Sequence, residues 1–462
     1  MPKKYSKLLP LNKSSKNRTV KKEISNWNLY PKVDAEEKYI YSSSDILNSQ
    51  NPFISTLRGN GRSYGDASLG EKTINTTTYN KILKFDSQTG AFTAQSGILL
   101  ADILRVIIPK GWFLPVTPGT KFITLGGAVS SDVHGKNHHS EGGFSKHIIS
   151  LSIMDETRHK MYCGPTENVN LFKSICGGMG LVAAILEVSI QLKPIETSFI
   201  KQKQIKASNL EALLPLFEQN THYTYSVAWI DCLKKGKHYG RSILMLGEHA
   251  KKDEINRKDK LSLVVSKKIN IPFSFPSFSL NKLTIGLFNW LYYNKNLRKE
   301  QNSITNYDSF FYPLDNLLNW NRIYGKKGFI QYQFVIPKDD GGKGIIHILK
   351  LISNKGMTSF LAVLKTMGKE DLGYISFPKE GYTLALDFPI KKGLFEFLDE
   401  LDQEILKLGG RLYLAKDARM DKATFHQTYE GISDFQATSK ITNKNQTFNS
   451  DLNTRLAILP EK

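Results

Sequence analysis

Three glycine-rich segments, all within the first 194 residues, constrain the fold of this chain more than any other feature. They are "RGNGRSYGDASLG" (58–70), "TPGTKFITLGGAVSSDVHGKNHHSEGGFSKH" (117–147) and "CGGMGLVAAILEVSIQLKP" (176–194). Glycine lets a backbone turn tightly and approach a bound group closely, because no side chain stands between them. Three such segments predict one large binding site built mainly from backbone.

The first segment does not match the two common phosphate-binding motifs. Its spacing is G-x-G-x-x-x-G (Gly59, Gly61, Gly65), and the residues after it carry no helical period, so the dinucleotide-binding fingerprint fails. No G-x-x-x-x-G-K-[ST] motif occurs either. A turn with successive backbone amides, together with Arg58 and Arg62 as fixed charges, still predicts contact with a diphosphate. Taken alone, the segment is equally compatible with a surface turn.

The second and third segments strengthen the diphosphate interpretation. A turn at 118–120 leads through a short predicted strand to Gly126 and Gly127, which are expected to open a small helix. A bare helix N-terminus there would be a second anion site. The third cluster continues into an apolar stretch, where backbone can lie flat against a ring system. Together the segments predict a large aromatic cofactor that carries a diphosphate.

Histidines in the second segment raise the alternative of a metal site. His134 and His138 are four residues apart, and Asp132 is near. Gly135 and Asn137 disfavour the helix that would bring both rings to one face, and no second ligand cluster is apparent. Contact with a polar substrate is therefore the favoured interpretation.

The hydrophobic pattern predicts an α+β fold whose character changes near residue 199. Before it, we predict a strand at 91–97 and a helix at 99–111 that ends at Pro109 and Gly111. After it come longer elements: the strands "YTYSVAWIDC", "SILMLGE", "GFIQYQFVIP" and "TLALDFPI", and the helices "GIIHILKLISNKG" and "LFEFLDELDQEILKLGG". For the aromatic-rich segment 266–299 we favour a mobile loop leading into a core helix over a surface that touches membrane lipid.

Polar side chains on two predicted strands are candidates for a site. Alternation along "GGRLYLAKDARM" (409–420) puts Leu412, Leu414 and Lys416 on one face, and a lysine in an apolar row is either solvated or aimed at an anion or electron-rich ring. In "GFIQYQFVIP" (328–337), Gln331 and Gln333 share a face. Paired amides suit sugar hydroxyls, although a solvated sheet face explains them equally well.

Composition restricts the partners without identifying one. Lys and Arg outnumber Asp and Glu by 63 to 43, a net charge of +20, which favours a phosphorylated substrate, an acidic lipid or a nucleic acid. Residues 1–22 are predicted to be a disordered basic arm without the features of a secretion signal. Three cysteines (Cys163, Cys176, Cys232) lack metal or redox spacing, and no run is long enough to span a membrane. We expect a cytoplasmic protein or one peripheral to the inner membrane.

Several motifs, in the same order along the chain, resemble those of the vanillyl-alcohol-oxidase-type FAD-linked oxidoreductases. They are "RGNGRSYGD", "PGTKFITLGGAVSSDVHGKNHH", "GGMGL", "YSVAWID", "YPLDNLLNWNRIYGKKGFIQYQFVIP", "LDFPI" and "GGRLYLAKDAR". The resemblance implies an FAD-binding domain of residues 1–198 plus 411–462, and a substrate-binding domain of residues 199–410 built on an antiparallel sheet. Two residues depart from the pattern: Ala385 stands where some relatives have cysteine, and Tyr312 where relatives often have histidine.

The resemblance also implies roles for individual residues. Lys416, His134 and Tyr64 would be catalytic, and no metal is implied. FAD would be held non-covalently, because Arg62 stands where many members carry the histidine that bonds to the flavin. Cofactor contacts are implied for Arg58, Gly59, Asn60, Gly61, Arg62, Ser63, Tyr64, Pro118, Gly119, Thr120, Thr124, Gly126, Gly127, Ser131, His134, Gly135, Asn137, Gly180, Ile185, Tyr413 and Lys416, and substrate contacts for Lys136, Trp229, Asn321, Gln331, Gln333 and Ala385.

The activity implied by the resemblance is oxidation of a sugar secondary alcohol to a ketone. The 2-hydroxyl of a polyprenyl-phosphate ribose is the favoured target, in an epimerisation that serves cell-envelope polysaccharide synthesis and that an NAD-dependent short-chain reductase would complete. Peripheral contact with membrane lipid is a further expectation. An aldonolactone or free-sugar oxidase of the same superfamily is the nearer alternative. A basic nucleic-acid-binding protein is the remote one, because the basic residues are dispersed and no reader motif appears.

Overall fold

The computed structural model describes residues 19–46, 54–263, 268–276, 279–338, 341–357 and 359–461. Most of the predicted basic arm, residues 1–18, lies outside the described residues. Its last four residues form the start of strand β1 (Thr19–Ser25), which pairs with β2 (Lys32–Tyr39), so the prediction of disorder is wrong for residues 19–22. Antiparallel pairing along the whole of β1 supplies the partners that the sequence of the arm did not reveal.

The N-terminal half contains two sheets. The first has the order β1-β2-β4-β3, with β3 at Thr56–Arg58 and β4 at Lys72–Asn75. The second has the order β5-β6-β10-β8-β9, formed by Ile82–Phe85, Ala91–Gln95, Ala184–Gln191, Ile148–Met154 and Lys160–Cys163 respectively. Four helices accompany these sheets: α1 (Leu100–Ile107), α2 (Leu125–Ser130), α3 (His138–Glu141) and α4 (Val169–Ile175).

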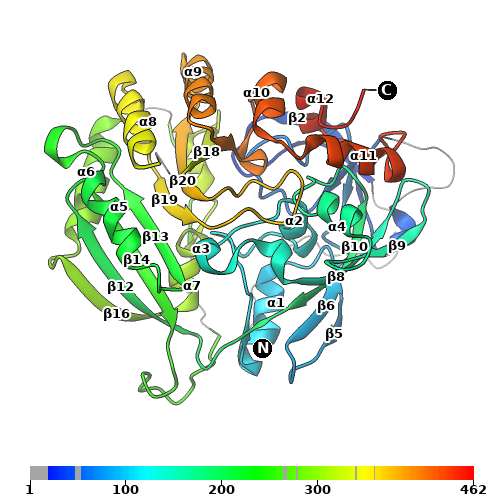
Figure 1. Ribbon diagram of the computed structural model, residues 1–462, viewed down its shortest axis with the longest axis horizontal. Helices are drawn as coiled ribbons and strands as arrows, with labels where there is room; N and C mark the ends of the chain where they lie inside the picture. Colours follow the sequence, from blue (N-terminus) through cyan, green and yellow to red (C-terminus); the bar gives the residue numbers. More distant parts are fainter. Residues whose placement is uncertain are drawn as a thin grey trace.

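A large antiparallel sheet dominates the rest of the molecule (Figure 1). Its order is β16-β12-β14-β13-β19-β20-β18-β21, formed by Glu300–Asn306, Phe199–Ala207, Ser242–His249, Tyr225–Ile230, Ala362–Met367, Gly381–Pro389, Phe329–Pro337 and Arg411–Leu412. Helices α5 (Leu210–Gln219) and α8 (Gly341–Lys355) pack on it, and α9 (Leu394–Lys407) leads into β21. Smaller elements are α6 (Lys282–Asn294), α7 (Tyr307–Phe311) and the strand pairs β7 (Trp112–Phe113) with β11 (Lys193–Pro194) and β15 (Ile269–Asn270) with β17 (Leu317–Leu318).

The C-terminal segment returns to the N-terminal half, where one of its helices packs against α4 (Figure 1). It contains α10 (Lys422–Thr428), α11 (Ile432–Thr442) and α12 (Asp451–Leu456). The Arg455 guanidinium pairs with two carboxylates, Asp66 at 2.8 Å and Asp417 at 2.8 Å. This one side chain therefore connects the first glycine segment with the segment that follows β21.

The predicted α+β class and most predicted elements are confirmed. The strand at 91–97 is β6, the helix at 99–111 is α1 followed by a 3-10 turn that ends at Gly111, and the longer strands and helices are β13, β14, β18, β20, α8 and α9. The three cysteines are free, and all three are buried. None of the helices in the described ranges is both long and apolar enough to cross a bilayer.

Three local predictions are wrong. The strand expected before Gly126 is reduced to an isolated bridge between Leu99 and Thr124. The strand expected to align Leu412, Leu414 and Lys416 ends at Leu412, because the chain turns into a 3-10 helix at Leu414–Lys416. The core helix expected within 266–299 is α6, and only Ile285 and Asn289 of α6 are buried.

The outer side of α6 explains why it is not a core helix. Leu283, Leu287, Trp290 and Leu291 are 83%, 59%, 53% and 55% exposed. Apolar residues therefore occur on both sides of α6, and those on its outer side are more than half exposed. Part of the loop before α6 (264–267 and 277–278) lies outside the described residues.

Gly65 offers a test of how closely the chain segments approach one another. A Cβ built at Gly65 would lie 1.6 Å from the carbonyl oxygen of Asp417, whereas a Cβ at Gly119 would have nothing within 4 Å, and φ of Gly119 lies outside the left-handed region. We expect Gly65→Ala to lower the free energy of unfolding by about 1–3 kcal/mol, because the backbone must shift. Gly119→Ala should change it by less than about 0.5 kcal/mol. Denaturant unfolding measures both, and equal effects would contradict the packing.

Candidate active site

One cavity of about 550 Å³ lies between the three glycine segments, the large sheet and α6. It brings together every predicted site residue except Asn137 and Asn321. The Asn137 amide donates instead to the carbonyl of Pro115 at 2.8 Å and to Glu141 at 2.7 Å, and the Asn321 amide donates to the carbonyl of Trp27 at 2.8 Å. Both asparagines therefore support neighbouring loops.

The first glycine segment is fixed by contacts to the other parts of the wall. The side-chain amide of Asn60 donates to the carbonyl of Phe122 at 2.7 Å, and the backbone amide of Tyr64 donates to the carbonyl of Ala415 at 2.9 Å. A Cβ at Gly59 would lie 2.3 Å from the hydroxyl oxygen of Thr124. Only glycine allows the first and second segments to meet this closely.

The two arginines of the first segment differ in what they contact. Arg58 donates to Asn26 at 2.7 Å and to the carbonyls of Ser25 and Ser68 at 2.8 and 3.0 Å. Its guanidinium is thus used to shape the loop, which argues against the predicted use as a charge for a diphosphate. The guanidinium carbon of Arg62 lies 4.0 Å from the centroid of the Trp27 ring, on the wall of the cavity.

The predicted anion site at the N-terminus of α2 is wrong. The amides of Leu125 and Gly126 donate to the carbonyls of Ile98 and Ser96 at 2.8 and 2.7 Å. The amide of Gly127 donates to the Thr124 hydroxyl at 3.1 Å. All three N-terminal amides are therefore satisfied by the protein, and α2 contributes to the cavity through the close approach of its backbone.

Glycines of the second and third segments form smooth parts of the wall. A Cβ at Gly119 would project into open space, and one at Gly180 would have only Leu57 within 4 Å. The third segment is held against α2 by the amides of Gly177 and Met179, which donate to the carbonyls of Val129 and Ser130. A side chain at Gly119 or Gly180 would occupy the volume that a flat, extended ligand needs.

Lys416 lies at the centre of the polar end of the cavity. Its Nζ is 3.5 Å from the centroid of the Tyr64 ring. Burial lowers the pKa of Lys416 to about 7, although the carboxylate of Asp387 acts in the opposite direction. Asp387 is fully buried, accepts from Gln331 at 2.6 Å and from Tyr324 at 3.0 Å, and has a pKa raised by burial to about 6.

The paired glutamines face this cavity and not solvent. The Gln333 amide donates to Nε2 of His134 at 3.1 Å and to the Thr383 hydroxyl at 3.2 Å. Burial, followed by the charge of Lys365, holds the pKa of His134 well below its ordinary value, so the imidazole is neutral. Its Nδ1 is buried and has no hydrogen-bond partner among the described residues. This orphaned atom is available to a ligand.

Two further lysines line the cavity. Lys136 donates to the carbonyl of Phe310, and its Nζ lies 4.3 Å from the centroid of the Phe310 ring. Burial lowers the pKa of Lys136 to about 7 and the pKa of Lys365 to about 8. Three half-buried lysines, with the buried carboxylate of Asp387 beside Lys416, make this end of the cavity suited to an anionic ligand.

Sequence reasoning missed Lys365 and Asp387. Lys365 shares a face of β19 with Val363, another residue of the wall, so strand alternation could have found it. Asp387 stands inside the apolar strand "LALDFP", and a charged residue at such a position is a signal in itself.

Comparisons with known proteins agree with this geometry. Residues 48–158 match the family model described as an FAD binding domain. The chain is 36% identical to decaprenylphosphoryl-beta-D-ribose oxidase of Mycolicibacterium smegmatis over 87% of this chain and 89% of that protein. It is 26% identical to mouse L-gulonolactone oxidase over 29% of this chain and 31% of that protein, and 26% identical to a putative D-arabinono-1,4-lactone oxidase of Neurospora crassa over 30% and 25%.

The residues present fit FAD as the cofactor. Gly119 and Gly180 leave room where a Cβ would intrude, and a largely apolar wall with a polar, cationic end suits a flat ring system that carries phosphates. The match to an FAD binding domain and the extent of the first similarity lead to one conclusion: this chain belongs to the decaprenylphosphoryl-β-D-ribose oxidase family, with the two-domain vanillyl-alcohol-oxidase-type fold, and is an FAD-dependent oxidoreductase acting on CH–OH groups.

Proposed function

We propose that this protein oxidises the 2-hydroxyl of a polyprenyl-phosphate ribose to a ketone. The observation that carries the proposal is the contact between Lys416 and Tyr64. This pair lines the same cavity as the three glycine segments, which fit FAD, and the sheet face that carries Gln331 and Gln333. The 36% identity to a decaprenylphosphoryl-ribose oxidase supports the choice of substrate. The lysines Lys136 and Lys365 suit its phosphate.

The cavity residues divide into those that hold the cofactor and those that act on the sugar. FAD would lie against the backbone of residues 59–63, 118–127 and 180–185 and would be held non-covalently, because the arginine at position 62 cannot form the histidyl bond. When bound, FAD would supply the two-electron acceptor for the hydride that leaves the sugar carbon, and the hydroxyl proton must leave as the ketone forms. Gln331 and Gln333 orient the sugar hydroxyls, and neutral His134 presents Nδ1 to a polar group.

Lys416 would stabilise the negative charge that the flavin ring system gains as the alcohol is oxidised. A well-placed donor in a water-poor site is worth a few kcal/mol of transition-state stabilisation. Tyr64 holds the ammonium group by its ring face, and Asp387 favours the protonated form. Asp387 is therefore a positioning residue that acts through Lys416 and Gln331.

The wider assignment keeps the domain division expected from the resemblance. Residues 1–198 plus 411–462 would form the FAD-binding domain and residues 199–410 the substrate-binding domain, with β21 joining the two. A short-chain NAD-dependent reductase would complete the epimerisation, and the protein would act in the cytoplasm, in peripheral contact with the lipid of the inner membrane. The aldonolactone oxidase alternative is less favoured, because the lactone oxidases match only about 30% of the chain.

Flavin bleaching under anaerobic conditions tests the reaction. A short-chain prenyl-phosphate ribose should bleach the 450 nm absorbance, whereas aldonolactones and free pentoses at equal concentration should not. The opposite order would replace the proposal by the lactone oxidase alternative.

Acid precipitation of the same protein should leave the yellow colour in the supernatant, since non-covalent FAD is released. Colour that stays in the pellet would exclude non-covalent attachment.

Lys416→Met tests the cation, because methionine keeps the length of the side chain and removes its charge. We expect the rate of flavin reduction to fall by about 10²–10³-fold while FAD stays bound. Lys440→Met, at an exposed position on α11, is the matched control and should have no effect. Stopped-flow absorbance measures both rates, and a normal rate in Lys416→Met would refute the role.

The pH dependence tests the pairing of Lys416 with Asp387. The rate of flavin reduction should decline as pH rises through the pKa of Lys416, about 7, because the cation is lost. Asp387 raises that pKa, so Asp387→Asn should move the decline to lower pH. Asp434→Asn, on the exposed side of α11, should leave the profile in place. If Asp387→Asn left the pH profile unchanged, the proposed influence of Asp387 on Lys416 would be wrong.

A further inference from the structure

Helix α6 has two apolar stripes, and the described part of the chain covers only one of them. On the inner stripe, which includes the buried Ile285, Phe288 and Tyr292 line the flavin cavity, although Phe288 remains 40% exposed. Their ring centroids lie 5.1 Å from Phe360 and 4.8 Å from Trp229. On the outer stripe, Leu283, Leu287, Trp290 and Leu291 repeat at helical spacing and are exposed. A helix at a protein surface ordinarily has one apolar stripe, so the outer one marks an interaction surface.

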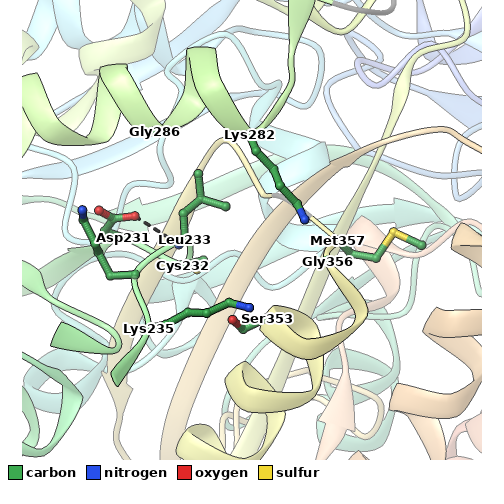
Figure 2. Close-up of a pocket in the computed structure, with 10 residues that line it drawn as sticks. Asp231, Cys232, Leu233, Lys235, Lys282, Gly286, Ser353, Gly356 and Met357 are labelled. Carbon is green, nitrogen blue, oxygen red and sulfur yellow. Dashed lines mark hydrogen bonds between the residues drawn. The ribbon is translucent and has the colours of Figure 1, made fainter. Parts of the chain in front are cut away.

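A second cavity, of about 270 Å³, lies beneath the first turns of α6. Three of its wall residues are lysines, Lys234, Lys235 and Lys282, and the other walls come from the turn after β13 and the end of α8. Figure 2 shows the side chains of Lys235 and Lys282 extending into this space from opposite sides, near Ser353 and Met357. We call it the lysine cavity.

The lysine cavity carries uncompensated positive charge. Its one carboxylate, Asp231, is paired with Arg241 at 2.8 Å and accepts from the buried Asn289 of α6 at 2.7 Å. Within the described ranges, Lys234, Lys235 and Lys282 form no ion pair with a carboxylate. Lys391 lies near this cluster: burial, and after it the charge of Lys282, lowers the pKa of Lys391. The cavity is therefore complementary to an anion.

We propose that the outer stripe of α6 and the lysine cavity together form a docking surface for an anionic phospholipid bilayer. Leu283, Leu287, Trp290 and Leu291 enter the headgroup–acyl boundary, and the lysine cavity takes the headgroup phosphates. Exposed apolar residues flanked by basic ones are the pattern of helices that lie in a membrane interface. A second copy of the chain is the poorer occupant, because a two-fold contact on α6 would bring the lysines of both copies together.

The reason for membrane docking rests on the proposed function, because that function requires a lipid-linked substrate. A lipid-linked sugar remains in the bilayer, and α6 is both the outer surface and part of the wall of the flavin cavity. Binding of α6 to a bilayer would therefore bring the α6 side of the flavin cavity close to the membrane in which the prenyl chain lies.

Sedimentation of the FAD-loaded, full-length protein with vesicles tests the surface directly. We expect binding to vesicles of equal parts phosphatidylglycerol and phosphatidylcholine, and little binding to phosphatidylcholine alone. Leu287→Ser with Leu291→Ser should abolish it. Lys234→Gln, Lys235→Gln and Lys282→Gln combined should weaken it by about fivefold for each lysine. Two matched controls change exposed residues elsewhere and should bind as the wild type does. The control for the leucine variant combines Leu83→Ser with Ile441→Ser. The control for the lysine variant combines Lys81→Gln, Lys84→Gln and Lys110→Gln.

The outcomes separate this inference from the proposed function. Loss of binding only in the α6 and lysine-cavity variants, with normal flavin content and normal flavin reduction by a short-chain substrate, supports the surface. Absence of binding to anionic vesicles, or equal loss in the controls, overturns it. A lipid-free dimer that Leu287→Ser with Leu291→Ser dissociates would overturn it in favour of a second copy. Vesicle binding by a protein whose flavin no prenyl-phosphate sugar reduces would sink the proposed function alone.

Discussion

The guanidinium of Arg455 is the interaction on which the polar end of the flavin cavity depends. It neutralises Asp66, two residues after Tyr64, and Asp417, the neighbour of Lys416. Two carboxylates buried this close would repel each other without a shared cation. The pairing holds the first glycine loop against the turn that carries Lys416, so Tyr64 and Lys416 can meet. Since these segments come from opposite ends of the chain, the site is complete only when nearly all of the chain has folded.

Local patterns predicted the walls of the cavity well and their connections poorly. The glycine segments and the alternating glutamines were visible in sequence, because backbone approach and strand period are local properties. The destination of the α2 amides was not, since Ser96 and Ile98, which accept two of them, are distant in sequence. Lys416 lines the cavity as the family motif implied, although the strand predicted to carry it ends at Leu412, because strand period does not show where a strand stops. Asp387 and Lys365 were missed because a buried charge has meaning only beside its partners.

The hydrophobic pattern of α6 shows a different limit. The helix expected in this aromatic-rich segment is present, but sequence alone does not tell whether an apolar stripe on a helix has a neighbour. Asn289 and Ile285 fix one side of the helix to the protein, and the other side is exposed within the described ranges. Part of the net charge of +20 lies beside this exposed stripe, because three lysines line the lysine cavity.

The three lysines that line the flavin cavity have a consequence for the folded state as a whole. Partial removal of Lys136, Lys365 and Lys416 from water costs free energy, and desolvation is the main cause of their lowered pKa values. An anion that enters the cavity removes part of that cost, and a ligand that binds only the folded chain stabilises it by mass action. The supply of cofactor and substrate thus sets the stability of the enzyme as well as its rate, and the protein is weakest when the cavity is empty.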